Sequence, residues 1–380
     1  MIERRIAEQL DHSSYSKPIW IYGPRRSGKT TLLSSVVNSE SLNWINGAVF
    51  SYKGALELRT ASDADTLLCA SKTIVIDEIL GIRDFEQKFK LLVERNRLKG
   101  WNRKIFVSTS SQPELNHCLA GLVDSLRLWP VSLQEYSSAY SWSELEESLG
   151  RLMIFGMLPG VVANPSEASD ILIDYCKGSL YRDVLYSCST RKPLKVEDLV
   201  YVLARHLGEE INYDTLAREV GISSSAAADY LNLLEKCFVI KVCPSFPDKA
   251  NVGLKKGKKI YFVDNGVRNA VLRDFRPLSC RPDAEALLEN FFFMERLKFN
   301  DYLGNQVQPY FWRAKTEGNM KKSGVDLLEV LNQNPIQGFK CTLSENPDVS
   351  RTEKRFAKYF QNCLLSTVTV ENLPGYFRQS

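Results

Sequence analysis

The feature that most constrains the fold of this chain is a phosphate-binding motif near its start, GPRRSGKT from Gly23 to Thr30. It matches G-x4-G-K-[ST], follows a short apolar run at residues 18–22, and precedes a helical stretch at residues 31–37. A strand that turns through glycines into a helix brings backbone N–H groups and the positive end of the helix to one point. The motif therefore predicts a parallel α/β sheet with a nucleoside triphosphate site at the end of its first strand.

Each residue type in the motif has a mechanical reason to be there. Gly23 and Gly28 permit the tight loop and the close approach of the backbone to phosphates. Lys29 is expected to reach the β/γ-phosphate oxygens, and Thr30 to offer its hydroxyl to Mg²⁺. The predicted nucleotide-binding residues are Gly23, Pro24, Arg25, Arg26, Ser27, Gly28, Lys29, Thr30 and Thr31.

A second β-branched apolar run, residues 73–76, ends in an acidic pair, Asp77 and Glu78. Ligand chemistry in an open parallel sheet gathers at the carboxyl ends of its strands. Asp77 is therefore expected to hold Mg²⁺, and Glu78 to orient and polarise the attacking water. The alternative is that the pair only caps the next helix; a preceding phosphate loop favours the first interpretation.

A third strand is predicted at residues 104–108 and runs into the hydroxyl residues 109–111. These hydroxyls could sense the γ-phosphate or hold the water, or they could form an ordinary cap for a helix after Gln112. Residues 83–99 carry an apolar stripe at helical spacing, which predicts a helix packed on the sheet. The stripe consists of Phe85, Phe89, Leu92 and Val93.

Composition excludes some classes of protein. The 380 residues are 44% hydrophobic and 25% charged, which suits two or three folded domains, and the net charge of +4 permits nucleic-acid contact without arguing for it. No apolar run approaches the roughly 18–20 residues of a membrane span. Ile2, Ile6 and Leu10 predict a short amphipathic helix and not an export signal, so we expect a cytoplasmic protein. Nine cysteines without a CxxC pair and three distant histidines predict reduced thiols and no zinc site.

Ordered segments along the chain carry a family resemblance. GPRRSGKTT, IVIDEI, FVSTSS, LAG–WPVSLQEY and MLPGVV are followed by YRDVL, KIYFVDNGVRNAV, ALLENFFFMERL and YFWRAKTEG. The chain resembles, over nearly its whole length, the prokaryotic AAA+ ATPases whose C-terminal region is a domain of unknown function related to PD-(D/E)XK nucleases. The resemblance implies ATP and Mg²⁺ as ligands. It makes Lys29 and Thr30 ligands of phosphate and Mg²⁺, Asp77 the Walker B acid, Glu78 the catalytic acid, and Ser108 or Ser110 the sensor.

Two positions depart from the pattern of that family. Leu80 replaces a usual Gln, and Leu122 replaces a usual Arg that is a plausible finger or sensor. An arginine finger contributes on the order of 10³–10⁵ in rate where it operates, so turnover could be slow. Arg127 and Arg182 are possible substitutes, although Arg182 could instead pair with Asp183 or another acid.

The middle of the chain predicts a helical lid and a winged helix. Residues 141–205 have helical spacing, and the resemblance makes them a lid over the nucleotide. Residues 213–223 open a helix–turn–helix pattern in which Gly221 makes the turn and Ser223 or Ser224 caps a second helix. Apolar runs at 238–242 and 259–263 would form the two sides of a wing. The predicted basic connector contains Lys249, Lys255, Lys256, Lys258 and Lys259.

A basic wing beside such a helix favours nonspecific contact with duplex DNA only slightly. The second helix has no Arg and no Gln, and its Asn232 lies late in it, which argues against base readout. Contact with a protein, or a purely structural role, is the alternative.

The C-terminal region resembles a nuclease that lacks part of its metal site. Asp326 and Lys340 are in place on two predicted strands, but Gly338 stands where an acid is expected two residues before the lysine, and Gly324 where a Glu is frequent. Helical Glu289 or Glu295 could supply another ligand. A site without its bridging carboxylate should hold metal poorly, so a scaffold or a degenerate nucleic-acid binder is favoured over an active nuclease.

The predicted fold is a P-loop parallel-sheet ATPase core (residues 1–140) with a helical lid (141–205), a winged helix (206–276) and a C-terminal α/β restriction-endonuclease-like domain (277–380). The predicted function is an AAA+-like ATPase that slowly hydrolyses ATP and thereby repositions its later domains, with duplex DNA as one candidate partner. A nucleotide-loaded protein-interaction module, with a protein partner or a second copy, is the first alternative, and an ATP-coupled nuclease is the second.

Overall fold

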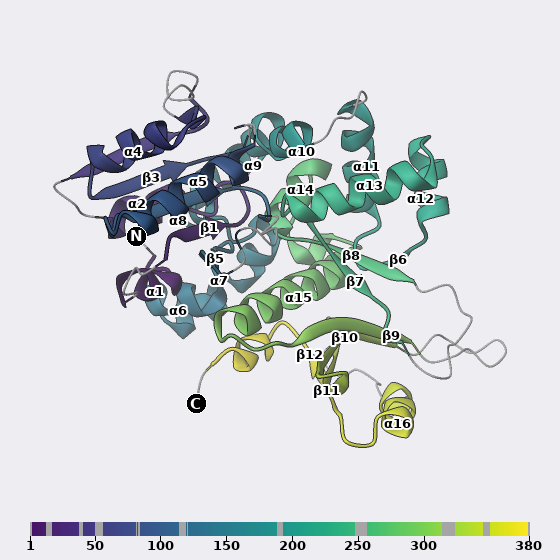
Figure 1. Cartoon of the computed structure of the whole chain (residues 1–380). Helices are drawn as coiled ribbons and strands as arrows, with labels where there is room; N and C mark the ends of the chain where they lie inside the picture. The colour runs from purple at the N-terminus through teal and green to yellow at the C-terminus, as the bar shows by residue number, and fades with distance from the viewer. Residues whose placement is uncertain are drawn as a thin grey trace.

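A computed structural model describes residues 2–12, 17–37, 41–49, 56–80, 82, 84–113, 119, 121–187, 193–247, 257–313, 324–344 and 350–378. Its N-terminal part is a five-stranded parallel sheet in the order β2-β3-β4-β1-β5 (Figure 1). The strands are β1 Ile19–Tyr22, β2 Leu42–Asn46, β3 Thr73–Asp77, β4 Lys104–Thr109 and β5 Asp124–Arg127. The predicted parallel α/β core is therefore present, and β4 separates the two strands that carry the phosphate loop and the acidic pair.

Helices cover both faces of this sheet. Successive side chains of a strand point to opposite faces, so apolar runs bury both sides. Trp20, Ile74 and Val107 pack with α4 and α5 on one face, and Ile21, Val75 and Phe106 pack with α1 and α2 on the other. The covering helices are α1 Ile6–His12, α2 Lys29–Val36, α4 Ala61–Ala70 and α5 Phe85–Leu98. The N-terminal amphipathic pattern thus forms a helix, but it begins at Ile6 and not at Ile2.

The stretch predicted as helical, residues 141–205, is helical over most of the part that the structure describes. Its helices are α7 Trp142–Phe155, α8 Pro159–Ala163, α9 Ala168–Gly178, α10 Leu180–Ser187 and α11 Pro193–Arg205, and α6 Leu133–Tyr140 comes just before it. Short 3-10 turns occur at η2 Pro165–Glu167, η4 Leu278–Cys280 and η5 Leu373–Tyr376.

The helix–turn–helix residues behave as their types predict. Helix α12 (Tyr213–Val220) ends at Gly221, whose φ of 72° lies in the left-handed region that glycine adopts freely. The Ser223 hydroxyl accepts from Ala226 N at 3.1 Å and caps α13 (Ser224–Lys236). The next strands are β6 Glu210–Ile211, β7 Ile240–Pro244 and β8 Lys258–Phe262, in the order β6-β8-β7. Assignment of this unit to the winged-helix class stays a prediction.

The basic connector needs one correction. Lys249, Lys255 and Lys256 lie outside the described residues. Lys258 and Lys259 belong to β8, and Lys259 is only 5% exposed. Lys259 therefore does not contribute to a solvated basic loop, because its ammonium group is paired with the carboxylates of Glu289 and Asp326.

The C-terminal part has a sheet of three antiparallel strands, β9, β10 and β11, with β12 parallel to β11 at the edge, in the order β12-β11-β10-β9. Its elements, with the helices before them, are α14 Asn265–Leu272, α15 Ala284–Tyr302, β9 Gln308–Arg313, β10 Gly324–Leu331, β11 Asn334–Cys341, α16 Ser350–Tyr359 and β12 Leu364–Val368. The strands predicted to carry Asp326 and Lys340 are thus adjacent, as β10 and β11. Relation of this region to nucleases stays a prediction.

One apolar cluster joins distant parts of the chain. It contains Trp129 and Leu152 from the first half, Tyr261 from β8, and Phe292 and Phe339 from the C-terminal part. Helix α15 lies at the centre of this arrangement, below α14 and above the C-terminal sheet (Figure 1). Within the described part of the chain, no helix is both long and apolar enough to cross a lipid bilayer.

Candidate nucleotide site

The phosphate loop joins β1 to α2 and is shaped by its glycines. Gly23 has a φ of 154°, and a Cβ there would lie 2.1 Å from the Leu128 carbonyl oxygen, so no side chain fits. Gly28 has a φ of 95° just before α2. Lys29 is 4% exposed, and its Nζ donates to Gly23 O at 3.0 Å and Pro24 O at 2.9 Å. The ammonium group therefore lies against the loop itself, where phosphate oxygens would compete for it.

Threonine and aspartate of the two predicted motifs are in contact. Thr30 Oγ1 donates to Asp77 Oδ2 at 2.8 Å, which joins the start of α2 to the end of β3. Asp77 is 1% exposed, and its other oxygen, Oδ1, accepts from Ser108 Oγ. A hydroxyl and a carboxylate are oxygen ligands of the kind that Mg²⁺ prefers. The donor set at this point thus fits the predicted metal.

Ser108 lies between the two acids. Its hydroxyl donates to Asp77 and accepts from Glu78 N at 3.0 Å. This contact exists because β4 pairs with both β1 and β3, so the end of β4 lies between the loop and the acidic pair. The helix that these hydroxyls were predicted to cap would begin after Gln112, and residues 114–118 lie outside the described part. Ser108 contacts the acidic residues whatever follows Gln112.

Glu78 has an unusual backbone conformation. Its φ of 55° lies in the left-handed region, which costs on the order of 1–3 kcal/mol for a residue with a side chain and is most frequent at functional sites. Its Oε2 lies 3.4 Å from Ser110 Oγ and 3.3 Å from Arg25 Nη2. The acid is therefore presented beyond the end of β3 and is bound there by two side chains.

The two loop arginines reach helices far away in the sequence. Arg25 Nε lies 3.0 and 3.1 Å from the two carboxylate oxygens of Asp183, on α10. Arg26 Nη1 donates to Ile171 O at 3.3 Å, and its guanidinium lies 5.6 Å from the centroid of the Tyr175 ring, both on α9. Sequence reasoning missed Asp183 as a partner of the site and paired it with Arg182 instead. The available signal was that YRDVL is among the family-like segments.

Burial changes the acidity of the loop lysine. Desolvation lowers the pKa of Lys29 to about 8, and the positive charge of Arg25 acts in the same direction. The carboxylates of Glu78, Asp183 and Asp77 oppose the shift. These charges therefore act on one another inside one shielded site.

The two arginines predicted as possible finger substitutes are Arg127 and Arg182. Arg127 pairs with Asp301 of α15 at 3.2 Å, and its guanidinium lies 5.1 Å from the centroid of the Trp129 ring. Leu122 packs against the apolar cluster under α4 and α5. Arg127 is thus bound to α15 and not to the acidic pair. Arg182 lies on α10, next to Asp183 in the sequence.

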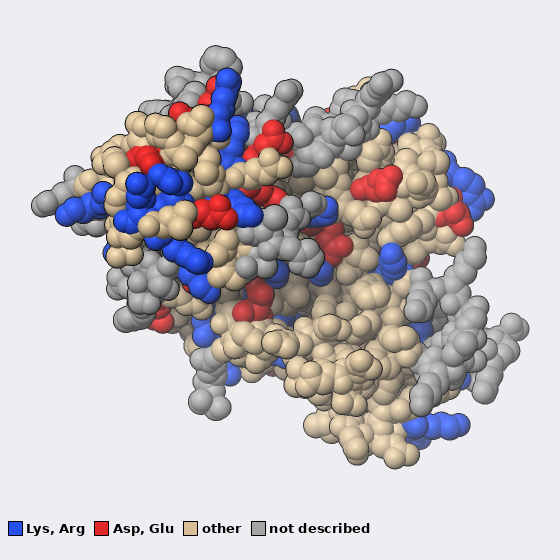
Figure 2. Space-filling view, viewed as in Figure 1, with Lys and Arg blue, Asp and Glu red and all other residues tan. Residues whose placement is uncertain are grey.

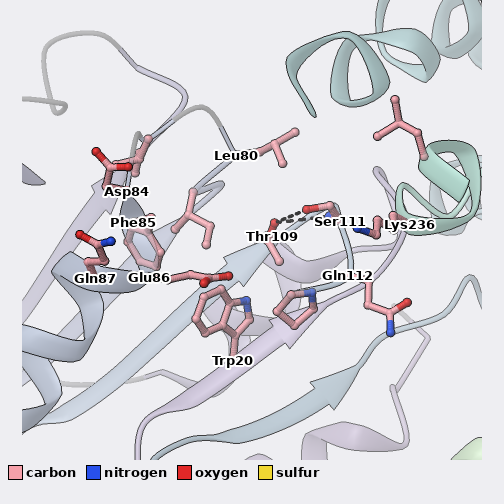
Figure 3. Close-up of a pocket in the computed structure, with 14 residues that line it drawn as sticks. Trp20, Leu80, Asp84, Phe85, Glu86, Gln87, Thr109, Ser111, Gln112 and Lys236 are labelled. Carbon is pink, nitrogen blue, oxygen red and sulfur yellow. Dashed lines mark hydrogen bonds between the residues drawn. The ribbon is translucent and has the colours of Figure 1, made fainter. Parts of the chain in front are cut away.

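A separate pocket of 480 Å³ lies beside this site (Figure 3). It is lined by Trp20, Leu80, Phe85 and Gln112, among others, and by Lys236 of α13. Gln112 N donates to Lys236 O at 2.8 Å, so the end of β4 is bonded to the end of α13. None of the loop residues from Gly23 to Thr30 lines this pocket, and Leu80 therefore faces a cavity distinct from the phosphate loop.

The second predicted site contains an extra cation. Lys340 Nζ lies 3.1 and 2.9 Å from the Asp326 oxygens, as predicted for neighbouring strands. Lys259 Nζ lies 2.7 Å from Glu289 and 3.3 Å from Asp326, so it bridges the two acids. Glu295 instead pairs with Lys298 and accepts from Leu133 N at 2.8 Å. Of the two predicted acids, Glu289 belongs to this cluster and Glu295 does not.

Two lysines neutralise the two acids of this cluster. Asp326 is buried and the Glu289 side chain is 12% exposed, and Lys259 lies between the two carboxylates, where a bridging cation would otherwise be needed. Among the described residues there is no group of three or more His, Cys, Asp or Glu side chains arranged to hold a metal ion. The geometry is that of a buried ion-pair network.

Comparisons with known proteins find similarity in the N-terminal part. Residues 15–137 match the family model described as "AAA domain". This segment is thus similar to the AAA domains of P-loop ATPases. Residues 146–277 match a domain of unknown function, DUF8612, which covers the predicted lid and winged helix together and ends where the C-terminal region begins.

Known relatives are distant. An uncharacterized protein of Haemophilus influenzae is 24% identical over 73% of this chain and 74% of its own length. The uncharacterized protein MJ1544 of Methanocaldococcus jannaschii is 24% identical over 92% of this chain and 80% of its own length. The Walker-type ATPase PABY2304 of Pyrococcus abyssi is a structural neighbour at 13% identity and a TM-score of 0.48, covering 72% of this chain and 96% of that one.

Proposed function

We propose that this protein is an Mg²⁺-dependent ATPase whose AAA domain drives a rearrangement of the regions that follow it. The single observation that carries the proposal is the bonded series Thr30–Asp77–Ser108–Glu78 beside the buried Lys29. It joins a phosphate-loop hydroxyl, a metal-binding acid, a polar strand end and a second acid within one site. Phosphoryl transfer needs little more than such positioning and charge.

Each residue would have one task. Lys29 would bind the terminal phosphates, and Thr30 with Asp77 would hold the metal ion. Bound Mg²⁺ would neutralise charge on the phosphate oxygens. Glu78 would orient and polarise the attacking water, and Ser108 would keep Glu78 and Asp77 in register; Ser110 bonds the Glu78 carboxylate and would report its position.

A rearrangement is supported by where the site is anchored. Arg25 bonds to α10 and Arg26 to α9, and Gln112, shortly after β4, bonds to the end of α13. Nucleotide at the loop would therefore act on the region of residues 146–277 directly. The matched domain of unknown function would then be the part that responds to nucleotide.

DNA is the less supported partner. Figure 2 shows basic and acidic side chains interspersed over α4 and α5, and few charges over the C-terminal sheet. Lys259 is buried, which removes one charge from the predicted wing. The structural neighbour titled as the replication initiator DnaA bound to AMPPCP and single-stranded DNA has a TM-score of only 0.29 and lends no weight.

Phosphate release by the purified chain with ATP and Mg²⁺ tests the proposal. We expect measurable turnover in the wild type, and a fall of roughly 100-fold or more in kcat for Glu78→Gln with ATP affinity retained, because the amide cannot polarise water as a carboxylate does. Lys29→Ala should lose ATP binding. Wild-type turnover in Glu78→Gln would contradict the assignment of the acid.

The same assay distinguishes the alternative. The missing arginine at Leu122 motivates a nucleotide-loaded interaction module with negligible hydrolysis. Tight ATP binding that Lys29→Ala abolishes, without turnover in the presence or absence of duplex DNA, would favour that module. Stimulation by DNA that is lost in Glu78→Gln would favour a DNA-coupled ATPase.

A further inference from the structure

The guanidinium group of Arg25 lies between two carboxylates from distant parts of the chain. Its Nε is bonded to both oxygens of Asp183, 158 positions away, and its Nη2 lies 3.3 Å from Glu78 Oε2. The side chains of Asp183 and Arg25 are 4% and 18% exposed. A buried acid on α10 therefore fixes an arginine that stands at the mouth of the nucleotide site.

One edge of this guanidinium remains available. Nε and Nη2 bond to carboxylates, whereas Nη1 forms no hydrogen bond with a described residue. Because the guanidinium is planar, an acid that holds the Nε edge also sets the direction of Nη1. The Arg25 side chain as a whole is 18% exposed, so a ligand can approach it.

The side-chain charges around the loop are more negative than positive before a nucleotide binds. Lys29 and Arg25 are positive, while Asp77, Glu78 and Asp183 are negative, and the other four groups all act on the charge of Lys29. A terminal phosphate adds two further negative charges at most, beside Glu78. A preorganised arginine is the usual means of stabilising such charge, and Arg127, one of the predicted finger substitutes, is bonded to Asp301.

We propose that Arg25 is the arginine that contacts the terminal phosphate of the bound nucleotide within the same chain, and that Asp183 is the positioning residue that aims it. This inference rests on the proposed ATPase function. A phosphate that accepts a hydrogen bond from Nη1 would move Nη2 away from Glu78. The bonds between Arg25 and Asp183 would then change, which gives α10 a direct part in the site. Glu78 is released for water when the nucleotide is complete.

The test compares affinities for ATP and ADP, measured with fluorescent analogues in Mg²⁺. Arg25→Ala should weaken ATP binding by roughly 10- to 100-fold, the range of a charge-assisted bond, and ADP binding by less than about 3-fold, because ADP lacks the terminal phosphate. Asp183→Asn should weaken ATP binding by roughly 3- to 10-fold, also without a comparable effect on ADP.

A double variant gives a readout that a structural role would not produce. If Asp183 acts through Arg25, Asp183→Asn adds nothing to the loss of ATP preference already present in Arg25→Ala. Asp174→Asn makes the same charge change at an exposed position of α9 and serves as the matched control. Arg25→Lys keeps the charge without the planar fork and should retain ATP preference only in part, which covers the case in which Arg25→Ala does not fold.

The outcomes separate this inference from the proposed function. An unchanged ATP-to-ADP ratio in both Arg25 variants, or fully additive effects of the two sites, overturns the inference and leaves the ATPase intact. A wild type that does not bind ATP, or that binds it no better than Lys29→Ala does, would overturn the proposed function instead. Equal losses of ATP and ADP affinity in Asp183→Asn would make Asp183 a structural partner only.

Discussion

The lowered pKa of Lys29 makes nucleotide binding depend on pH. Phosphates bind the ammonium form, which the nucleotide-free site keeps below pH about 8 and loses above it because burial disfavours the charge. We expect ATP affinity to be nearly constant from pH 7 to 8 and to fall by up to about tenfold per unit above that. Titration of ATP binding between pH 7 and 9.5 measures this.

Lys29→Arg is the matched control for that titration, because its guanidinium stays charged throughout the range. Any residual ATP affinity of this variant should not change with pH. The stability of the nucleotide-free fold changes with pH in the opposite direction to the ATP affinity. The unfolded lysine titrates near 10.5, so the nucleotide-free fold bears a cost below pH about 8 that disappears as the pH rises to 10.5. A wild-type affinity that is flat to pH 9.5 would show that Lys29 remains fully charged.

Among the elements, the N-terminal segment that leads into α1 contacts the phosphate loop. Arg4, two residues before α1, is 8% exposed; its Nη1 donates to Ser27 O at 2.6 Å and its Nε to Glu135 Oε1 at 3.1 Å. Removing one partner of a buried pair costs about 3–5 kcal/mol, since the other charge stays buried and unpaired. Arg4→Met should lower the free energy of unfolding by that amount and weaken ATP binding.

Arg5→Met is the control at this scale. Arg5 is more exposed, and its side chain bonds only to Gln134 among the described residues, so its loss should cost less than about 1 kcal/mol. Urea unfolding of both variants, with and without ATP, measures the difference. Equal stability of the two variants would mean that the buried bonds of Arg4 are not needed to support the loop.

At the scale of the whole molecule, the shared apolar cluster predicts cooperative unfolding. Phe292 of α15 is fully buried and packs against Phe339 of β11 in a cluster that also contains Trp129 and Tyr261. Phe292→Ala should cost about 3–5 kcal/mol. We expect calorimetry to show one transition that moves down as a whole, with its ATP-dependent shift preserved.

Leu364→Ala is the matched control, because this β12 side chain is 77% exposed and its truncation should change little. A Phe292→Ala transition that splits, with an N-terminal component at the wild-type temperature, would show that the AAA domain unfolds independently of the C-terminal part.

The sequence by itself determined what depends on local spacing. The phosphate loop, the acidic strand end, the helix stripe at Phe85 and Phe89, and the turn at Gly221 are all set by residues within a few positions of one another. Backbone conformation and capping respond to such neighbours directly. The AAA domain was therefore predictable from about a hundred residues.

Tertiary structure alone decided which distant charges meet. Arg25 pairs with Asp183 across 158 positions, and Lys259 lies between Glu289 and Asp326 and not in a solvated loop. Ser108 contacts both acids because β4 is placed between β1 and β3, an order that no local pattern specifies. The energy of an ion pair depends on burial and geometry, which arise only when separate elements pack.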